Sequence, residues 1–337
     1  MFSARDSEPS AADGAGRPGS PALRRGRYAS IDVGSNSVLL LVADVDGDGR
    51  LTPIAERGSI TRLGEHFFQT GRLTRDAMDR TRAVIAQYAD RAAAAGAEVM
   101  TAVGTSVLRE APNAPLFLDE VRRESTVEIE VISGEREAEL AYLGNVYDRS
   151  LPASDDLRIV VDIGGGSTEV VEGSCRRVKR RASFPLGAVR LTEQCLKTDP
   201  PTVAELMDAD TAIQNALFSV DAVKPGSVVL LSGGTAYNLC SVARAGGLIS
   251  SPAVHGTVLR HTVVAELVEL FRSLPLKFKR RVPGLEVERA DVILGGAMIL
   301  HQVVAQLGVS HAVVTTNGVR HGCLLDLAAR LGSGARP

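Results

Sequence analysis

Hydrophobic positions along the chain form two kinds of segment: short apolar runs, and longer stretches in which apolar residues recur every three or four positions. The short runs indicate buried strands, and they cover residues 99–103, 228–231 and 312–315. The periodic stretches indicate helices with one buried face, and they cover residues 135–147, 202–218, 262–274 and 291–307. A further helix begins after Thr74, which can cap it, and ends near Gly96. Since strands alternate with helices, the pattern predicts an α/β protein.

One strand–loop–strand pattern occurs twice. A strand from Arg27 ends in the loop Asp-Val-Gly-Ser-Asn-Ser at residues 32–37, and two more strands follow. The second copy begins at Arg158 and runs into Asp-Ile-Gly-Gly-Gly-Ser-Thr at residues 162–168, again before two strands. Such a duplication is typical of a chain with two similar halves. A chain of 337 residues is also longer than a single hydrophobic core usually supports, so we expect two domains. The two loops should face each other across the cleft between them.

The expected boundaries follow from composition and from the repeat. Residues 1–26 are rich in Ser, Ala, Gly, Pro and Arg, and we expect a disordered tail there. The first domain should span 27–134, with the last helix, at about 318–332, packing back onto it. The second domain should span 135–317.

Composition and charge narrow the class of protein. Hydrophobic residues make up 45% and charged residues 23%, as in globular proteins. The net charge of −2 gives no reason to expect nucleic acid as a partner, and no apolar run approaches the ~18 residues needed to cross a membrane. The four cysteines (Cys175, Cys195, Cys240, Cys323) are far apart, which argues against disulfides and zinc. We therefore expect a cytoplasmic protein.

The two loops have the composition of phosphate-binding loops. Glycine lets backbone N–H groups approach an anion, and Ser, Thr and Asn add side-chain donors. The candidate ligands are Ser35, Asn36, Ser37, Gly164, Gly165, Gly166, Ser167 and Thr168. The aspartate before each loop would repel bare phosphate, which points to a divalent cation such as Mg²⁺. A strand follows each loop, whereas a P-loop or a Rossmann turn would open a helix.

These residues resemble the exopolyphosphatase/guanosine pentaphosphatase (Ppx/GppA) family of the actin–hexokinase–Hsp70 superfold. The matching segments, in the family's order, are 31–37, 104–110, 131–138, 161–169, 186–193, 232–235 and 319–322. The resemblance covers almost everything after Arg27 and is closest to the short members, which stop after a two-domain core. It implies two actin-like (ribonuclease H-like) domains, each a mixed sheet flanked by helices.

The resemblance also implies roles for single residues. Glu137 matches the family's essential glutamate and would be the catalytic base that activates water. Asp162 and Glu169 match the metal-binding carboxylates, and Asp32 could contribute. Arg109 would add a permanently charged phosphate contact. Arg190 could guide a longer phosphate chain, although a surface role explains it about as well.

The activity implied is Mg²⁺-dependent release of orthophosphate from the end of inorganic polyphosphate. Conversion of pppGpp to ppGpp is the alternative with the same chemistry. A sugar-kinase-like phosphotransferase and a non-catalytic sensor of (p)ppGpp or polyphosphate are two further alternatives, and a homodimer is possible. The chain departs from the family at Leu39, where many members have a basic residue or His. It also departs at 317–322, where Asp-x-Gly-Leu-Arg-Glu-Gly is frequent. The departures weaken the substrate assignment rather than the fold.

Overall fold

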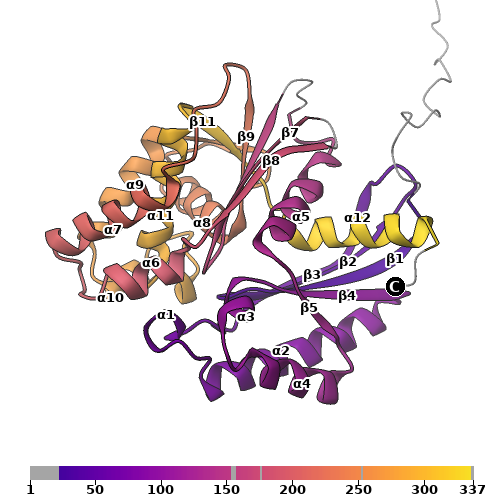
Figure 1. Ribbon diagram of the computed structural model, residues 1–337. Helices are drawn as coiled ribbons and strands as arrows, with labels where there is room; N and C mark the ends of the chain where they lie inside the picture. The colour runs from indigo at the N-terminus through magenta and orange to yellow at the C-terminus, as the bar shows by residue number, and fades with distance from the viewer. Residues whose placement is uncertain (1–22, 153–156, 175–176, 252, 335–337) are drawn as a thin grey trace, which may run out of the picture.

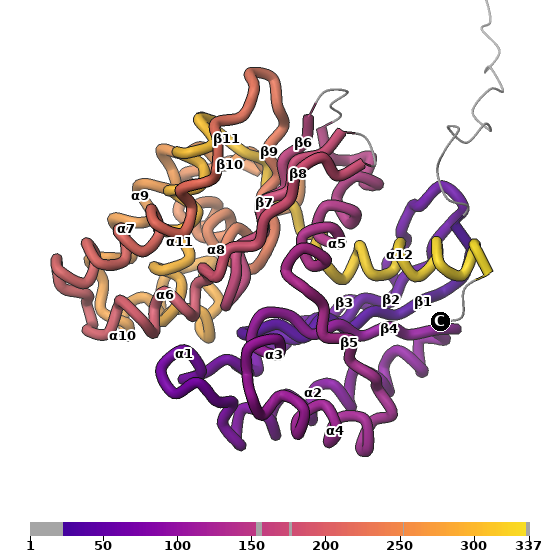
Figure 2. Tube along the Cα trace, viewed as in Figure 1, coloured from indigo at the N-terminus to yellow at the C-terminus, as the bar shows by residue number. Residues whose placement is uncertain are grey.

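The computed structural model describes residues 23–152, 157–174, 177–251 and 253–334, arranged around two sheets (Figures 1 and 2). The first sheet has the order β3-β2-β1-β4-β5, and the second has the order β10-β11-β9-β6-β7-β8. Each sheet contains parallel and antiparallel pairs and is flanked by helices, so the predicted fold class is confirmed. No helix among the described residues is long and apolar enough to cross a membrane.

The elements of each half follow in chain order. The first sheet and its helices are β1 (Gly26–Val33), β2 (Ser37–Val45), β3 (Leu51–Ile60), α1 (Phe67–Thr70), α2 (Arg75–Ala94), β4 (Val99–Gly104), α3 (Ser106–Glu110), α4 (Ala114–Ser125) and β5 (Ile129–Val131). The connecting helix is α5 (Gly134–Val146). The second sheet and its helices are β6 (Arg158–Ile163), β7 (Thr168–Ser174), β8 (Arg177–Phe184), α6 (Ala188–Cys195), α7 (Val203–Leu217), β9 (Val228–Ser232), α8 (Gly233–Ala245), β10 (Thr257–Arg260), α9 (His261–Ser273), α10 (Leu276–Lys279), the short 3₁₀ helix η1 (Val287–Arg289), α11 (Ile293–Gln306) and β11 (His311–Val314). Helix α12 (Val319–Gly332) ends the described fold.

The repeat seen in the sequence is a pair of antiparallel hairpins in the middle of the sheets. Strands β1 and β2 pair with Asp32 opposite Leu39, and strands β6 and β7 pair with Asp162 opposite Glu169. Each aspartate also lies beside a parallel strand, opposite Val103 in β4 or Ser232 in β9. Both aspartates therefore lie at the carboxyl end of a central strand, where a strand-to-strand loop begins.

The helices predicted from periodicity are confirmed to within one or two residues at each end. Thr74 caps α2 by accepting a hydrogen bond from the N–H of Ala77 (3.3 Å), and Thr202 caps α7 in the same manner with Glu205. Strand β9 leads straight into α8. Gly233, with φ +89°, makes that junction.

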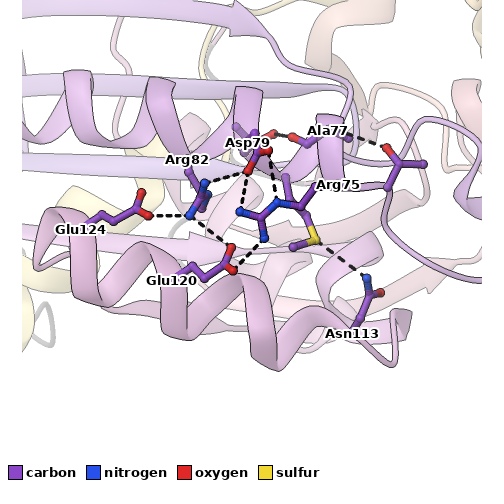
Figure 3. A network of polar contacts seen from close by, with 10 residues as sticks. Arg75, Ala77, Asp79, Arg82, Asn113, Glu120 and Glu124 are labelled. Carbon is purple, nitrogen blue, oxygen red and sulfur yellow. Dashed lines mark hydrogen bonds and ion pairs between the residues drawn. The ribbon is translucent and has the colours of Figure 1, made fainter.

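An ion-pair network joins α2 and α4 on the outer face of the first sheet (Figure 3). The guanidinium of Arg75 contacts Glu120 at 2.8 Å, and that of Arg82 contacts Glu124 at 2.5 Å. Asp79 of α2 pairs with both arginines. The helices bury Phe117 and Ile85 in the same apolar cluster as the strands of the first sheet, and the network joins the two helices outside this cluster.

Helices α5 and α12 lie side by side between the two sheets (Figure 1). Helix α12 packs on β1 and β2, whereas α5 also packs on β7 and β8 of the second sheet. The division at residue 134, with the last helix returning to the first half, stays a prediction.

The chain enters the fold earlier than the predicted end of the tail at residue 26. Leu23 is buried in the cluster with Leu324 and Ala328, and the N–H of Arg24 donates to the Ala328 carbonyl at 3.0 Å. Residues 23–26 therefore belong to the fold, and that limit is wrong. Residues 1–22 and Cys175 lie outside the described residues.

Helices α5 and α12 approach closely at two glycines, which makes their crossing sensitive to a single methyl group. A Cβ on Gly322 would lie 1.9 Å from the Leu140 carbonyl oxygen, and one on Gly144 would lie 2.5 Å from that of Gly318. Because backbone cannot yield as a flexible side chain does, Gly322→Ala should lower the free energy of unfolding by about 1–3 kcal/mol. Urea titration measures this.

Gly47→Ala is the control for that substitution, since a Cβ there would meet only the side chain of Arg25 at 3.4 Å. The free energy of unfolding should fall clearly more in Gly322→Ala than in Gly47→Ala. Equal stability of Gly322→Ala and the wild type would contradict the close crossing.

Candidate active site

The two loops face each other across a cleft between the sheets. The cleft has a volume of about 460 Å³, and both loops, Asp32, Glu137, Asp162 and residues 315–320 line it. A Cβ on Gly165 would lie 3.1 Å from the Cβ of Ser35, and a Cβ on Gly166 would lie 2.4 Å from the Oγ of Ser106. A Cβ at residue 166 would force Ser106 of α3 to shift, and one at residue 165 would press on the first loop, so the second loop lies in close contact with both.

The carbonyl groups of each loop are hydrogen-bonded on the side away from the cleft. In the first loop, the Ser35 carbonyl accepts from the N–H of Gly64 (2.7 Å), and the Asn36 carbonyl accepts from residues 61 and 62 (3.1 and 2.9 Å). In the second loop, the carbonyls of residues 164 and 165 accept from the first N–H groups of α6 at 2.9–3.1 Å. In a trans peptide the C=O and the N–H point in opposite directions. Because these carbonyls point away from the cleft, the N–H groups of the same peptides point toward it.

Two side chains of the first loop are buried without a partner among the described residues. The Oγ of Ser35 and the Nδ2 of Asn36 have no hydrogen-bond partner. The residues are only 3% and 6% exposed. Buried donors of this kind are uncommon unless something binds them. Together with the loop amides, they form a set of donors suited to phosphate oxygens.

Asp32 and Asp162 lie at the bottom of the cleft. Burial, together with the charges of Glu137 and Asp162, raises the pKa of Asp32 from 3.8 to about 8, although Arg320 opposes the shift. Burial also raises the pKa of Asp162, while a hydrogen bond from the Oγ of Ser232 (3.0 Å) opposes it. Burial is thus the main reason that the pKa values of both carboxyls are raised.

Glu137 lies in the first turn of α5 and lines the same cleft. Ser133 caps this helix by accepting from the N–H of Arg136 at 3.1 Å, which fixes the direction in which Glu137 enters the cleft. Burial raises its pKa from 4.5 to about 7, and the charge and hydrogen bond of Arg109 oppose the rise. The guanidinium of Arg109 contacts the Glu137 carboxylate at 2.7 Å. Glu135 lies in the same turn with its side chain 72% exposed.

Three of the predicted site residues do not line the cleft. Arg109 lies behind Glu137 and also donates to the Ile132 carbonyl at 2.9 Å. The hydroxyl of Thr168 donates to the Leu186 carbonyl at 2.6 Å, so it is engaged inside the fold. The carboxylate of Glu169 accepts from the Oγ of Ser183 at 2.7 Å, and burial raises its pKa well above the usual value. All other predicted site residues line the cleft.

A divalent cation fits the chemistry of this carboxylate set. The charge of Asp162 raises the pKa of Asp32, Glu137 and Glu169, and the charge of Glu137 raises that of Asp32 and Glu169, so a cation would relieve this repulsion. No three His, Cys, Asp or Glu side chains among the described residues converge as a metal cage. A cation here would therefore use one or two carboxylates together with water and phosphate oxygens, which is the coordination that Mg²⁺ prefers.

Comparison with known proteins agrees with this geometry. The sequence matches the Ppx/GppA phosphatase family over residues 41–331. The chain belongs to this family. It is 32% identical over 318 residues to exopolyphosphatase 2 of Mycobacterium tuberculosis, covering 90% of this chain and 98% of the relative. It is 31% identical over 306 residues to exopolyphosphatase 1 of the same organism, covering 89% and 87%. The Aquifex aeolicus Ppx/GppA enzyme superposes with a TM-score of 0.74 at 35% identity, covering 90% and 99%.

The departure from the Ppx/GppA pattern at His321 has a structural explanation. His321 is the third residue of α12, and its Nδ1 accepts the N–H of Gly318 at 3.2 Å. A glutamate at that helix position can accept the same N–H, as in the side-chain half of a capping box. Burial lowers the pKa of His321 well below its usual value, so the ring is neutral and can accept. This substitution therefore preserves the helix start and adds no charge to the cleft.

Three cleft residues had no role assigned from the sequence. Arg320 lines the cleft, pairs with Glu56 at 3.1 Å, and lowers the pKa of Asp32 and Asp162. Arg289 reaches across the cleft and donates to the Oγ of Ser37 at 2.9 Å. Asn317 donates to Asp148 at 2.7 Å and so ties the cleft to the end of α5. Only Arg320 lies in a motif that signalled the family; the position of Arg289 depends on the packing of η1.

The raised pKa of Asp32 has a consequence for stability in the absence of divalent metal. Between pH ~4 and ~8 the folded protein keeps a proton that the unfolded chain has lost, so the free energy of unfolding should fall as pH rises. Asp32→Asn should remove up to about 1.4 kcal/mol per pH unit of that slope. Urea unfolding from about pH 5 to about pH 8 in EDTA, for both proteins, measures the difference.

The variant is needed because His321, whose pKa is lowered, contributes a slope of the opposite sign. Subtracting the two pH profiles isolates Asp32. Identical profiles would show that the carboxyl is ionised throughout.

Proposed function

We propose that this chain is an Mg²⁺-dependent exopolyphosphatase that hydrolyses the terminal phosphoanhydride of inorganic polyphosphate and releases orthophosphate. One observation carries the proposal. Two hairpin loops, whose carbonyls are hydrogen-bonded on the other side, present amide donors to one cleft, and the carboxylate of Glu137 lies in that same cleft. Donors that bind phosphate and a base for water are what phosphoanhydride hydrolysis requires.

The donors divide between the two loops. The loop from Ser35 to Ser37 and the loop from Gly164 to Ser167 would hold the terminal phosphate groups from opposite sides. Backbone amides do this without bringing a competing negative charge, and they are already oriented by the hydrogen bonds behind them. Thr168 would contribute through its position in β7 rather than through its hydroxyl, which is engaged.

Glu137 would take a proton from water at its carboxylate and so direct the oxygen toward the terminal phosphorus. Arg109 contacts that carboxylate at 2.7 Å and favours its ionised form, so we propose that it controls the base rather than gripping substrate directly. A base whose pKa is near neutral is well suited to this task.

Asp162 and Asp32 would hold Mg²⁺, with Glu169 supporting the site from behind. When bound, the cation would neutralise charge on the phosphate oxygens. Asp162 is held for this role by Ser232 of β9, and a Cβ on Gly233 would lie 2.6 Å from its Oδ1. We also propose a cytoplasmic location, on the cysteine pattern; a homodimer stays a prediction.

One observation favours guanosine pentaphosphatase as the second candidate. A groove of about 690 Å³ continues from the cleft, sharing Tyr237 and Glu286 with it. Tyr237 is 40% exposed, and an exposed aromatic side chain can contact a nucleobase. A bare phosphate chain would have no use for that face.

The deciding experiment compares kcat/KM for long polyphosphate, short polyphosphate and pppGpp with Mg²⁺ present. Preference for polyphosphate would support the proposal, and preference for pppGpp would support the second candidate. Tight binding without phosphate release would indicate a non-catalytic sensor, and release that requires a sugar acceptor would indicate a phosphotransferase.

Glu137→Gln should lower kcat by about 10²–10⁴-fold, the range for loss of a general base. Polyphosphate Kd should stay similar or improve, because one negative charge leaves a cleft that binds an anion. Single-turnover rates and equilibrium binding measure the two effects. Glu135→Gln is the matched control and should be near normal, since that side chain is exposed. Normal cleavage by Glu137→Gln would exclude it as the base.

Asp162→Asn should raise the Mg²⁺ concentration needed for half-maximal activity, because one anionic ligand is lost. Titration of activity with Mg²⁺ measures this, and circular dichroism checks the fold. Asp221→Asn, on an exposed carboxylate paired with Arg180, is the control and should leave the titration unchanged. A wild-type titration for Asp162→Asn would remove this residue from the metal site.

A further inference from the structure

The segments that back the two loops also contact each other. Residues 61–64 back the first loop, and the start of α6 backs the second. From these two segments, and from the helices next to them, side chains reach across the gap between the halves. We call these contacts the clasp; it consists of Arg190 and Glu193 of α6 with Phe68, Glu110 and the backbone of residues 66–68.

Glu193 makes one half of the clasp. Its two carboxylate oxygens accept the N–H groups of His66 (2.6 Å) and Phe68 (3.1 Å). These amides open the short helix α1, so they have no acceptor within their own helix. A carboxylate that accepts two amides fixes both the distance and the direction between the segments.

Arg190 makes the other half and reaches the second loop directly. Its Nε donates to the Gly166 carbonyl at 2.8 Å, and its Nη2 contacts the Glu110 carboxylate at 2.5 Å. The guanidinium also stacks on the Phe68 ring, 4.2 Å from its centroid. The side chain is only 11% exposed. Because two of its nitrogens and one face of the guanidinium are engaged and the side chain is mostly buried, it is poorly placed to guide a phosphate chain, which the sequence had offered as one role.

The contact of Arg190 with Gly166 affects the next peptide N–H. Because the Gly166 carbonyl points to Arg190, the Ser167 N–H points away from it, toward the cleft. Glu110 follows Ser106 by one helical turn and accepts its Oγ at 3.2 Å, and Ser106 is the residue that a Cβ on Gly166 would strike. Arg190 thus orients an amide of the second loop while it contacts the first half of the molecule.

We propose that Arg190 and Glu193 are positioning residues, which clasp the segment behind one loop to the helix behind the other and so set the spacing of the two rows of amide donors. The inference rests on the proposed function of these loops. It predicts that loss of the clasp impairs the chemical step more than substrate binding, because each row still binds phosphate but the two no longer fit one transition state.

Arg190→Lys and Glu193→Gln test the proposal while keeping side-chain size. Each should lower kcat by about 10–100-fold, with KM for polyphosphate changed less than about threefold. The double variant should lose less than the product of the single effects, since both residues act through one contact. Phe68→Leu, which keeps an apolar side chain but removes the stack, should give a smaller loss in the same direction.

Arg180→Lys and Glu269→Gln are the matched controls, because they make the same substitutions in exposed ion pairs elsewhere. Both should behave as wild type. If Arg190 gripped substrate, Arg190→Lys would raise KM more for long than for short polyphosphate and leave kcat unchanged; that result would overturn the proposal. Unchanged kcat and KM in both clasp variants would also overturn it.

Hydrogen exchange provides a readout that does not depend on activity. In either clasp variant, amides of residues 61–68 and of residues 164–168 should exchange faster together, although the two segments belong to different halves. Faster exchange in only one segment would overturn the proposal. A wild-type protein that releases no phosphate would instead overturn the proposed function, and the exchange result would still decide whether the clasp couples the loops.

Discussion

The structure depends on one constraint: the backbone carbonyls of two hairpin loops must accept hydrogen bonds on the side away from the cleft, so that the loop amides can face it. A peptide unit cannot direct its C=O and N–H to the same side. Residues 61–64 supply the donors behind the first loop, and the start of α6 supplies them behind the second. The glycines at 165 and 166 then let the loops approach so closely that a Cβ at either position would push on Ser35 or Ser106.

The same constraint explains why Asp32 and Asp162 lie together in the cleft. Asp32 and Asp162 end the central strands from which the loops begin, so any arrangement that brings the loops together also brings these carboxylates together. Burial raises the pKa of both carboxyls, and the charge of Asp162 raises that of Asp32 further. A site with repelling carboxylates and unused amide donors is suited to a cation and an anion bound together, as in phosphoryl transfer.

Helices α5 and α12 connect the halves, and their close crossing at Gly144 and Gly322 limits how the halves can move. Glu137 lies at the start of α5, so the proposed base is carried by the connection rather than by either sheet. His321 begins α12 with a neutral side-chain cap in a position where the family often has glutamate. That exchange keeps the start of α12 and puts a neutral ring where a carboxylate would stand.

Much of the fold could be predicted from the sequence because the signals were local. Apolar periodicity located α2, α5, α7, α9 and α11, and the repeated Asp-and-glycine loop located both halves of the cleft. Helices α4, α6 and α8 were not predicted: α6 is short, and α8 begins directly at a glycine pair that also suits a turn. Residues 23–26 were assigned to the tail because their composition resembles it, whereas burial of Leu23 against α12 decides otherwise.

The candidate site, like the fold, was predictable from the sequence only in part. The sequence by itself determined which residues carry chemistry, since glycine-rich loops and the aspartates before them are set by residue type and spacing. Only the tertiary structure decided what each side chain contacts. Arg109 was predicted as a phosphate ligand, but packing places it behind Glu137, and Arg190 was a candidate guide for substrate, but it contacts Gly166, Glu110 and Phe68. The reason is physical: a guanidinium has several donors, and which acceptors lie within reach depends on segments far apart in the chain.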